Sequence, residues 1–494
     1  MYPSQTSLIP ATVSLARFFE ENGFSAFNHL YPYWYLGSTP FRYLIGPVAP
    51  VMLTALNKLF PTATLFTITI YIVLFSLLLS AAGWGLFSYA LSKDKRLGLV
   101  VGLLTIILPW RYLSSLAMDE ASLVLARNFV PFALLAVWSF LKATSWKSTL
   151  WALLATTFLL LINTSILPIF LVGVTSLALA RAFKEGKVRN LSKHIKRSFF
   201  LVSGSLLLAT LWYTPGYWLT ILANPSIGGA SGIKVIFRVF DLLKALLPLG
   251  LAVLAVYFSR QIKTRLTLFG LTWTLTFLFL TLFRFIGDPD FWTDWIAWFY
   301  ELEIGLILFV VEPFENLFKG LKFQKATYIS FLLLLIMPFL ALFIYEKLGK
   351  PTLISNRTPE GIKSLEKLSQ IAKDKRVFLS GSTVFWANAL HDIYQVRGGR
   401  DQVARHPHWD KAAYELREGT NPELSRMWLE KLGVSYVLVH TKSSKEFYHD
   451  FRNIEKWDGL GDIVWQEDGD ILYRSIQENS AIYGGDAPYH SVWD

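Results

Sequence analysis

The sequence predicts an α-helical polytopic membrane protein with about ten transmembrane helices, followed by a soluble α/β domain. Hydrophobic stretches fill residues 47 to 346, and the stretch from Phe331 to Tyr345 is apolar at nearly every position. With its flanks, that stretch reaches the roughly 20 residues that are needed to cross a bilayer. After residue 350 the sequence turns polar, which indicates that the membrane part ends there.

Composition supports a membrane protein and limits its partners. Of 494 residues, 53% are hydrophobic and 17% are charged, and the mean hydropathy is +0.40, which places the chain outside the soluble globular class. The net charge of +11 comes from residues 1 to 346, which hold 27 Lys and Arg against 15 Asp and Glu. This excess indicates basic membrane loops and no nucleic acid partner. The absence of cysteine excludes disulfides and a cysteine nucleophile.

Charge alternates between the loops that join the predicted spans. The spans cover residues 63–90, 97–113, 121–142, 148–163, 165–181, 198–222, 240–258, 266–284, 293–313 and 326–346. Every second loop is basic, and these loops together hold 18 Lys and Arg, near residues 93–96, 142–147, 181–197, 260–265 and 319–325. The intervening loops hold Lys234 and Arg238, with Arg111 and Arg284 at their edges. The positive-inside rule therefore places the basic loops in the cytoplasm and both ends of the chain outside it.

The predicted organisation has three parts. Residues 1–46 form an extracytoplasmic loop with an amphipathic helix at 9–22, residues 47–346 form the transmembrane helical domain, and residues 347–494 form a soluble extracytoplasmic α/β domain with a flexible tail. An outward N-terminal segment normally follows a spanning helix or a signal peptide, and Met1 to Ser7 is neither. We therefore expect that a first transmembrane helix is missing upstream. The alternative is that a short polar tail is translocated by itself.

The soluble domain is predicted to combine helices and strands. Helices are expected near 358–373 and 421–432, and strands at 376–380, 435–440, 463–465 and 471–473. The domain contains no G-x-G-x-x-G, P-loop, zinc-ligand or G-x-S-x-G pattern, so it has no enzyme signature of its own.

The order of these parts resembles a known superfamily. The resemblance rests on four stretches, which are Tyr33 to Tyr43 followed by Gly46 to Pro50, Met118 to Ser122 leading to Pro131, Leu161 to Ser165, and Gly433 to Val439. The chain resembles the GT-C superfamily of multi-pass membrane glycosyltransferases. In particular it is similar to a bacterial and archaeal branch that is sometimes labelled 6-pyruvoyl-tetrahydropterin synthase-related, a label that implies no pterin chemistry here.

The resemblance implies a catalytic role for carboxylates in the outer loops. In the superfamily, a sugar on a polyprenyl phosphate meets its acceptor in an outward-facing cleft, where a carboxylate of the first outer loop acts as base or orients the acceptor. A second acidic motif follows in the next outer loop, and with one helix missing upstream this motif corresponds to Asp119 and Glu120. In residues 1–46 the acids are Glu20 and Glu21, so Glu21 is the candidate for the first loop, where the family has an aspartate. The alternative is that Asp119 and Glu120 only start the helix at 121, because acids favour a helix N-terminus.

Further candidate residues lie within the span predicted at 293–313. Asp294, Glu301 and Glu312 share one helical face, whereas Glu303 points almost oppositely. Charges inside a span are costly, so they are expected to face a cavity unless Asp294 and Glu312 lie at the two interfaces. We expect the cavity to be lined by Tyr33, Trp34, Tyr35, Asp288, Asp294 and Glu301. For the aromatic residues an interfacial belt is the open alternative.

Two arginines are candidates for binding the phosphate of the lipid donor. Arg42 lies in the aromatic segment and Arg284 at the outer end of a span, and a guanidinium holds a phosphate through two parallel hydrogen bonds. Arg284 could instead pair with Asp288.

Three functions are compatible with this pattern. The first is a membrane glycosyltransferase of the cell envelope that uses a polyprenyl-phosphate-linked sugar donor, in contact with membrane lipids of a prokaryotic plasma membrane. The second is a solute or proton-coupled transporter, which the intramembrane acids also suggest, although no inverted repeat is found. The third is a catalytically degenerate membrane scaffold. The cofactor is unknown, and a divalent metal ion is an open alternative.

The charge pattern gives a test of topology. Because 18 cations lie in one set of loops and 4 in the other, reporters fused at residues 190 and 420 should report opposite compartments, with residue 190 inside the cytoplasm. Reporter activity in the same compartment at both positions would refute the predicted topology.

Overall fold

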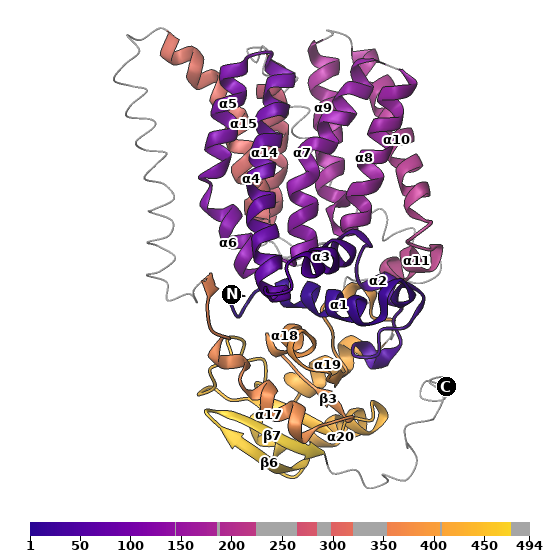
Figure 1. Cartoon of the computed structure of the whole chain (residues 1–494), viewed down its shortest axis with the longest axis vertical. Helices are drawn as coiled ribbons and strands as arrows, with labels where there is room; N and C mark the ends of the chain where they lie inside the picture. The colour runs from indigo at the N-terminus through magenta and orange to yellow at the C-terminus, as the bar shows by residue number, and fades with distance from the viewer. Residues whose placement is uncertain are drawn as a thin grey trace. The chain divides into compact units, whose positions relative to one another are not determined.

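Helices make up most of the structure, a computed structural model that describes residues 1–143, 145–184, 188–223, 264–283, 298–319, 353–405 and 408–475 (Figure 1). The chain divides into two compact units. The first unit comprises Met1–Ile70, Pro215–Gly232 and Thr352–Asp494, and the second comprises Tyr71–Thr214 and Ile233–Pro351. The predicted boundary at residue 346 lies outside the described residues, and the division into three domains stays a prediction.

The second unit is a bundle of helices. Its helices are α4 (Leu65–Ser92, which begins in the first unit), α5 (Lys95–Ile106), α6 (Pro109–Ala117), α7 (Ala121–Lys142), α8 (Trp146–Ile162), α9 (Leu167–Lys184), α10 (Val188–Ala209), α14 (Arg265–Phe283) and α15 (Trp298–Lys319). Helix α7 packs against α8 and α9, while α14 packs against α9 and α15, and α15 also packs against α5 and α6. The helical membrane architecture predicted from the sequence is therefore confirmed in outline.

The number of spans is not confirmed. Among the described residues, α4, α7 and the segment Thr164–Ala182 are long and apolar enough to cross a membrane. The α5–α6 pair makes a fourth span if it is counted as one, although the two helices are bent by 46°. The span predicted at 97–113 breaks before Pro109, because proline disfavours a helical conformation in the residue that precedes it. The span predicted at 198–222 breaks between Ala209 and Pro215, which is the first residue of α11. The spans predicted at 240–258 and 326–346 lie outside the described residues.

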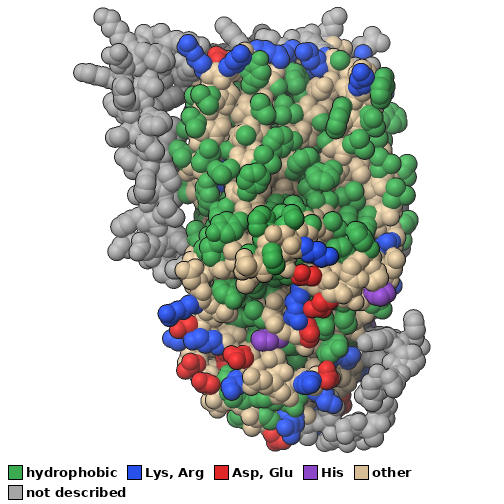
Figure 2. All heavy atoms as spheres, viewed as in Figure 1, with side chains coloured by type: hydrophobic (Ala, Val, Ile, Leu, Met, Phe, Trp, Pro, Cys, Tyr) green, Lys and Arg blue, Asp and Glu red, His purple; other side chains and the backbone are tan. Residues whose placement is uncertain are grey.

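The surface of the helical unit is apolar and ends in a basic rim. Large apolar side chains such as Phe75, Leu99 and Leu211 are 65%, 65% and 83% exposed. In Figure 2, apolar side chains cover the helices and basic ones gather at one end. A continuous apolar surface of this kind is costly in water and is suited to lipid. The described structure therefore agrees with a membrane protein, while the side to which each end faces stays a prediction.

In the first unit the N-terminal segment packs against the tail domain, which comprises the described residues 353–405 and 408–475. Helix α1 (Ile9–Asn22) is buried along most of its length and contacts α3 (Val48–Leu59) and α18 (Thr383–Leu390). The short strands β1 (Tyr2–Pro3) and β2 (Ile354–Ser355) pair antiparallel. Between α1 and α3 lie the short helices η1 (Gly23–Asn28), η2 (Tyr35–Gly37) and α2 (Phe41–Leu44), and α11 (Pro215–Ala223) also belongs to this unit. The amphipathic helix predicted at 9–22 is confirmed, and its apolar face is covered by protein.

The tail domain contains a five-stranded sheet. The strands are β3 (Arg376–Phe378), β4 (Tyr394–Gln395), β5 (Tyr436–His440), β6 (Gly461–Glu467) and β7 (Asp470–Ser475), in the order β4-β3-β5-β7-β6. Strands β4, β3 and β5 are parallel, and β5, β7 and β6 are antiparallel. Helices η6 (Glu360–Ile362), α17 (Ser364–Ile371), α18, α19 (Trp409–Arg417) and α20 (Pro422–Lys431) complete the domain. The predicted α/β character and the four predicted strands are confirmed.

A glycine brings α14 and α15 into backbone contact. A Cβ atom at Gly270 would lie 2.5 Å from the carbonyl carbon of Leu308 and would also clash with the amide nitrogen of Phe309. Small residues at such crossings let two membrane helices approach closely, and here Gly270 lets α14 approach the middle of α15.

The substitution Gly270→Ala should therefore separate α14 from α15. Overpacking of this kind costs about 1–3 kcal/mol, which thermal unfolding of the purified protein in detergent would detect. Gly204→Ala in α10 is the matched control, because a Cβ there would meet only the end of the Leu153 side chain, at 3.2 Å. Equal stability of the two variants would contradict the tight α14–α15 crossing.

Candidate functional site

Asp119 lies in the short turn between α6 and α7 and is buried. It is 6% exposed, and its backbone N–H donates to the carbonyl of Ser114 at 2.9 Å. Its Oδ2 accepts hydrogen bonds from the Ser114 hydroxyl and from Nη1 of Arg127, the latter at 2.5 Å. Both contacts use Oδ2, so Oδ1 takes no part in them. Asp119 is thus fixed in orientation with one oxygen left for another partner.

Glu120, 8% exposed, is held by one side chain that follows α8 and by one in the first turn of α7. It stands at the N-cap position of α7, yet its side chain caps none of the first N–H groups. It accepts a hydrogen bond from Nδ2 of Asn163, just after α8, at 3.2 Å, and one from the hydroxyl of Ser122 at 3.3 Å. The partners of this carboxylate are therefore buried side chains, Asn163 after α8 and Ser122 in the first turn of α7.

Arg127 links Asp119 to Glu301. Its side chain is fully buried in α7, and its Nε lies 3.7 Å from Oε1 of Glu301, at the beginning of α15. The guanidinium also stacks over the ring of Tyr300 at 5.3 Å. The indole N–H of Trp273 on α14 donates to the backbone carbonyl of Glu301 at 2.8 Å, which fixes the position of that residue. One buried cation thus lies between two buried carboxylates.

Arg111 is a second buried arginine, and it shares Tyr300 with Arg127. It is 1% exposed and donates to the backbone carbonyls of Thr105 at 2.7 Å and Leu77 at 3.3 Å. It also donates to Oδ1 of Asn128 and to the hydroxyl of Tyr300, both at 3.3 Å. These bonds connect α4, α5, α6, α7 and α15, so we assign to Arg111 the role of holding the helices around the carboxylates.

The structure brings two of the predicted site residues, Asp119 and Glu301, together through Arg127. Glu120 is next to Asp119 in the chain but binds Asn163 and Ser122. Glu303 accepts a hydrogen bond from the backbone N–H of Trp110 at 3.3 Å, at the start of α6. Glu312, at the other end of α15, accepts hydrogen bonds from Thr264 and Thr267. Arg284, Asp288 and Asp294 lie outside the described residues.

The predicted acid and arginine of the N-terminal segment belong to the first unit. Glu21 is exposed and forms an ion pair with Arg17 at 3.3 Å. Arg42 is half-buried and donates through Nε to the carbonyl of Phe27 at 3.3 Å. Their catalytic and phosphate-binding roles stay predictions.

The three predicted aromatic residues also belong to the first unit. Tyr33 packs against Tyr394, with ring centroids 5.3 Å apart and the rings tilted by 50°. Trp34 is fully buried and donates to Asn388 at 3.0 Å, and Tyr35 is buried against Asp401. Burial raises the pKa of Tyr33 and Tyr35 above the usual value of tyrosine. All three residues contact the tail domain, and the cavity that they were expected to line stays a prediction.

Sequence reasoning missed Arg127 and its neighbours. The cations considered were those of the loops, whereas Arg127 and Asn128 lie inside the span predicted at 121–142. An ionisable residue inside an apolar span is itself a signal of a functional position, because its burial is costly. Asn163 lies in one of the stretches that carry the family resemblance. Its contact with Glu120 could not be predicted from a local pattern, because the two residues are 43 positions apart in the sequence.

The described residues do not form a metal site. They contain no group of three His, Cys, Asp or Glu side chains arranged to hold a metal ion. Oδ2 of Asp119 binds Arg127 and Ser114, so Asp119 has one oxygen left. A divalent metal ion needs several oxygen ligands. We therefore derive no step that involves a metal.

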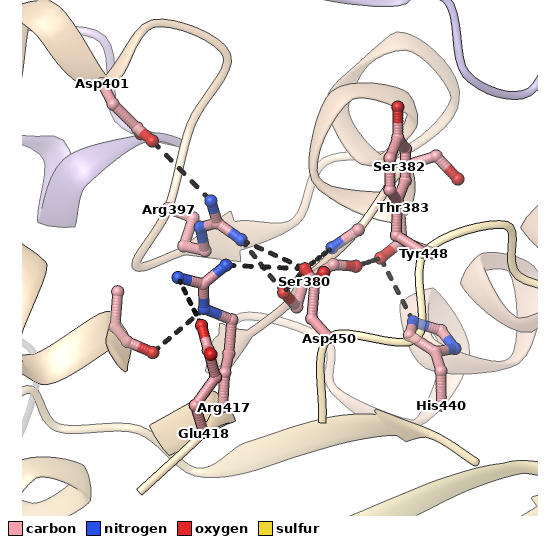
Figure 3. A network of polar contacts seen from close by, with 12 residues as sticks. Ser380, Ser382, Thr383, Arg397, Asp401, Arg417, Glu418, His440, Tyr448 and Asp450 are labelled. Atoms are coloured by element: carbon pink, nitrogen blue, oxygen red, sulfur yellow. Dashed lines mark hydrogen bonds and ion pairs between the residues drawn. The ribbon is translucent and has the colours of Figure 1, made fainter. Parts of the chain in front are cut away.

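A second polar network lies in the tail domain, around the turn that follows β3 (Figure 3). Asp450 accepts hydrogen bonds from the hydroxyl of Ser380 and, at 3.1 Å, from the N–H of Gly381. Burial raises the pKa of Asp450, but these bonds and the charges of Arg397 and Arg417 outweigh burial and hold the pKa below its usual value. Its donors come from the same domain, so this network stabilises the turn, and we assign no chemistry to it.

Comparison with known proteins found solved structures of similar fold, and two of them are oligosaccharyltransferases. One is the archaeal oligosaccharyltransferase AglB from Archaeoglobus fulgidus in complex with an inhibitory peptide and a dolichol-phosphate, with 13% identity, a TM-score of 0.48, and coverage of 86% of this chain and 65% of that chain. The other is the oligosaccharyltransferase from Archaeoglobus fulgidus in complex with Zn and sulfate, with 14% identity, a TM-score of 0.51, and coverage of 86% and 63%. No protein-family model and no curated protein matches the sequence.

The likeness to the second structure shows a shared fold. The shared fold supports the predicted GT-C-like fold, whereas the bacterial and archaeal branch stays a prediction. The chain spans slightly less than two thirds of the length of the proteins that it resembles. At this level of identity the likeness extends to the fold alone.

The charge balance of the cluster can be tested by substitution. Arg127→Met should leave Asp119 and Glu301 buried without a counter-charge, at a cost of about 3–5 kcal/mol. Adding Asp119→Asn and Glu301→Gln should recover most of the lost thermal stability, because no buried charge is then left unpaired. Arg42→Met, which removes a half-buried arginine bound to a carbonyl, serves as the control and should cost less. A triple variant no more stable than Arg127→Met would contradict the ion-pair cluster.

Proposed function

We propose that the protein is a membrane glycosyltransferase that moves a sugar from a polyprenyl-phosphate-linked donor to a glycan, lipid or protein of the cell envelope. The observation that carries this proposal is the buried Asp119, which keeps Oδ1 available while Arg127 and Ser114 hold Oδ2. The fold shared with an oligosaccharyltransferase supports the reaction class. On this proposal the site faces the outside of a prokaryotic plasma membrane.

The reaction requires a base beside the acceptor. In the proposed step, the acceptor nucleophile forms a bond to the anomeric carbon of the sugar, the bond from that carbon to the phosphate oxygen breaks, and the lipid phosphate leaves with the electron pair. Asp119 takes the proton of the acceptor at Oδ1, and the bonds to Oδ2 keep the carboxylate in place. Glu120, held by Asn163, orients the acceptor from the same turn.

The donor phosphate requires cationic groups. Arg42 and Arg284 are the proposed phosphate ligands, since a guanidinium matches two phosphate oxygens, and Glu21 is the proposed carboxylate of the first outer segment. Arg127 is not proposed for this role, because Asp119 and Glu301 already neutralise its charge.

Sugar transfer from labelled polyprenyl phosphate sugars in reconstituted membranes tests the proposal. Asp119→Asn should lower the rate at least about 100-fold, because an amide of equal shape cannot take the proton. Glu120→Gln should also lower the rate. Glu303→Gln is the matched control on α15, and its rate should stay near that of the native chain. Full activity in both carboxylate variants would remove them from the site, and an absence of transfer from every donor would reject the function.

A further inference from the structure

One edge of the Arg127 guanidinium makes no hydrogen bond. Its Nη1 donates to Asp119 and, at 3.4 Å, to Ser114, whereas Nε and Nη2 are buried without a hydrogen-bond partner. The N–H groups of Nε and Nη2 point in the same direction and form the side-on fork that usually binds two oxygens or one bridging oxygen. The side chain is fully buried, so solvent at the surface does not serve these donors.

Glu301 faces this fork with an oxygen that is also unbonded. Its Oε1 is buried, accepts no hydrogen bond, and lies 3.7 Å from Nε of Arg127. That separation is too long for a hydrogen bond. Leaving buried donors and an acceptor unpaired is costly, so a group that bonds to both sides would be favoured.

A group that bonds to both side chains must accept hydrogen bonds from Arg127 and donate one to the carboxylate of Glu301. A phosphate or carboxylate would accept from Arg127 but would meet the negative charges of Glu301 and Asp119. An ammonium group would donate to Glu301 but would be repelled by Arg127. A hydroxyl both donates and accepts, so one oxygen about 2.8 Å from each atom, beside the 3.7 Å line that joins them, would bond to both.

We propose that Arg127 and Glu301 form a binding pair for one hydroxyl of the transferred sugar. This inference rests on the proposed function and names the part of the substrate that the cluster recognises. Arg127 would then contact the sugar through Nε and Nη2 and the base Asp119 through Nη1. A single guanidinium thereby couples the placement of the sugar to the orientation of the base.

Sugar binding can be measured separately from transfer. The probes are short-chain polyprenyl phosphates that carry glucose, mannose or galactose, and the same lipid phosphate without a sugar, each added to the full chain in nanodiscs. The native chain should bind at least one sugar-bearing lipid more tightly than the bare phosphate. Removing the bound hydroxyl, in a panel of deoxy analogues of that sugar, should weaken binding roughly 10- to 100-fold at one ring position.

Glu301→Gln keeps the shape of the side chain and removes its charge, so it should abolish most of the preference for that hydroxyl. Glu303→Gln, two residues further on α15, is the matched control and should keep the preference. If Glu301→Gln does not fold, the deoxy analogues on the native chain still decide the matter. Equal affinity for all deoxy analogues, or an unchanged preference in Glu301→Gln, would overturn the inference and leave the pair as a site for water only.

The outcomes separate this inference from the proposed function. Hydroxyl-dependent binding that Glu301→Gln removes, without any sugar transfer, would support the binding pair and reject the glycosyltransferase. Transfer that depends on Asp119, with an unchanged hydroxyl preference in Glu301→Gln, would support the enzyme and reject the binding pair.

Discussion

The charge of Arg127 sets the arrangement of the helical unit. A single charged side chain near the middle of a bilayer costs roughly 2.5–3.5 kcal/mol on insertion scales, and a buried ion remains costly unless it is paired. Arg127 comes from α7, Asp119 from the turn before it, and Glu301 from α15, almost two hundred residues later in the chain. The cluster is complete only when these elements are assembled, so its electrostatics favour one arrangement of α6, α7 and α15 over others.

The surrounding polar residues extend this constraint to the remaining helices. Arg111 donates to carbonyl groups of α4 and α5, and Asn128 donates to the hydroxyl of Ser76 on α4 at 2.7 Å. Tyr300 donates to Asn128 and lies under both guanidiniums, each 5.3 Å from its ring. The turn that carries Asp119 and Glu120 is thus supported by helices on several sides. A base that must stay oriented during a reaction needs support of this kind.

The sequence was informative where the physical signal is local. Long apolar stretches predicted α4 and α7 within two residues, and acids placed in an outer loop pointed to Asp119 and Glu120. The break before Pro109 was missed because hydropathy averages over a proline that ends a helix. The pairing of Arg127 with Glu301 could not be predicted, since periodicity reports which face of a helix is buried but does not identify its partner. The catalytic roles remain untested, because they depend on substrate contacts that neither sequence nor fold contains.

The polar groups around Asp450 and those around Arg127 differ in a way that bears on function. Around the turn after β3, Asp450 receives hydrogen bonds from Ser380 and Gly381 and faces Arg397 and Arg417, so its charge is balanced and stability alone can explain the arrangement. Around Arg127, two donors and a carboxylate oxygen of Glu301 stay unbonded although they are buried. Apolar residues of similar volume are often as stable as a buried ion pair or more so, and an incompletely bonded one is worse still. Stability therefore gives no reason for the open edge of Arg127, whereas the binding of a hydroxyl does.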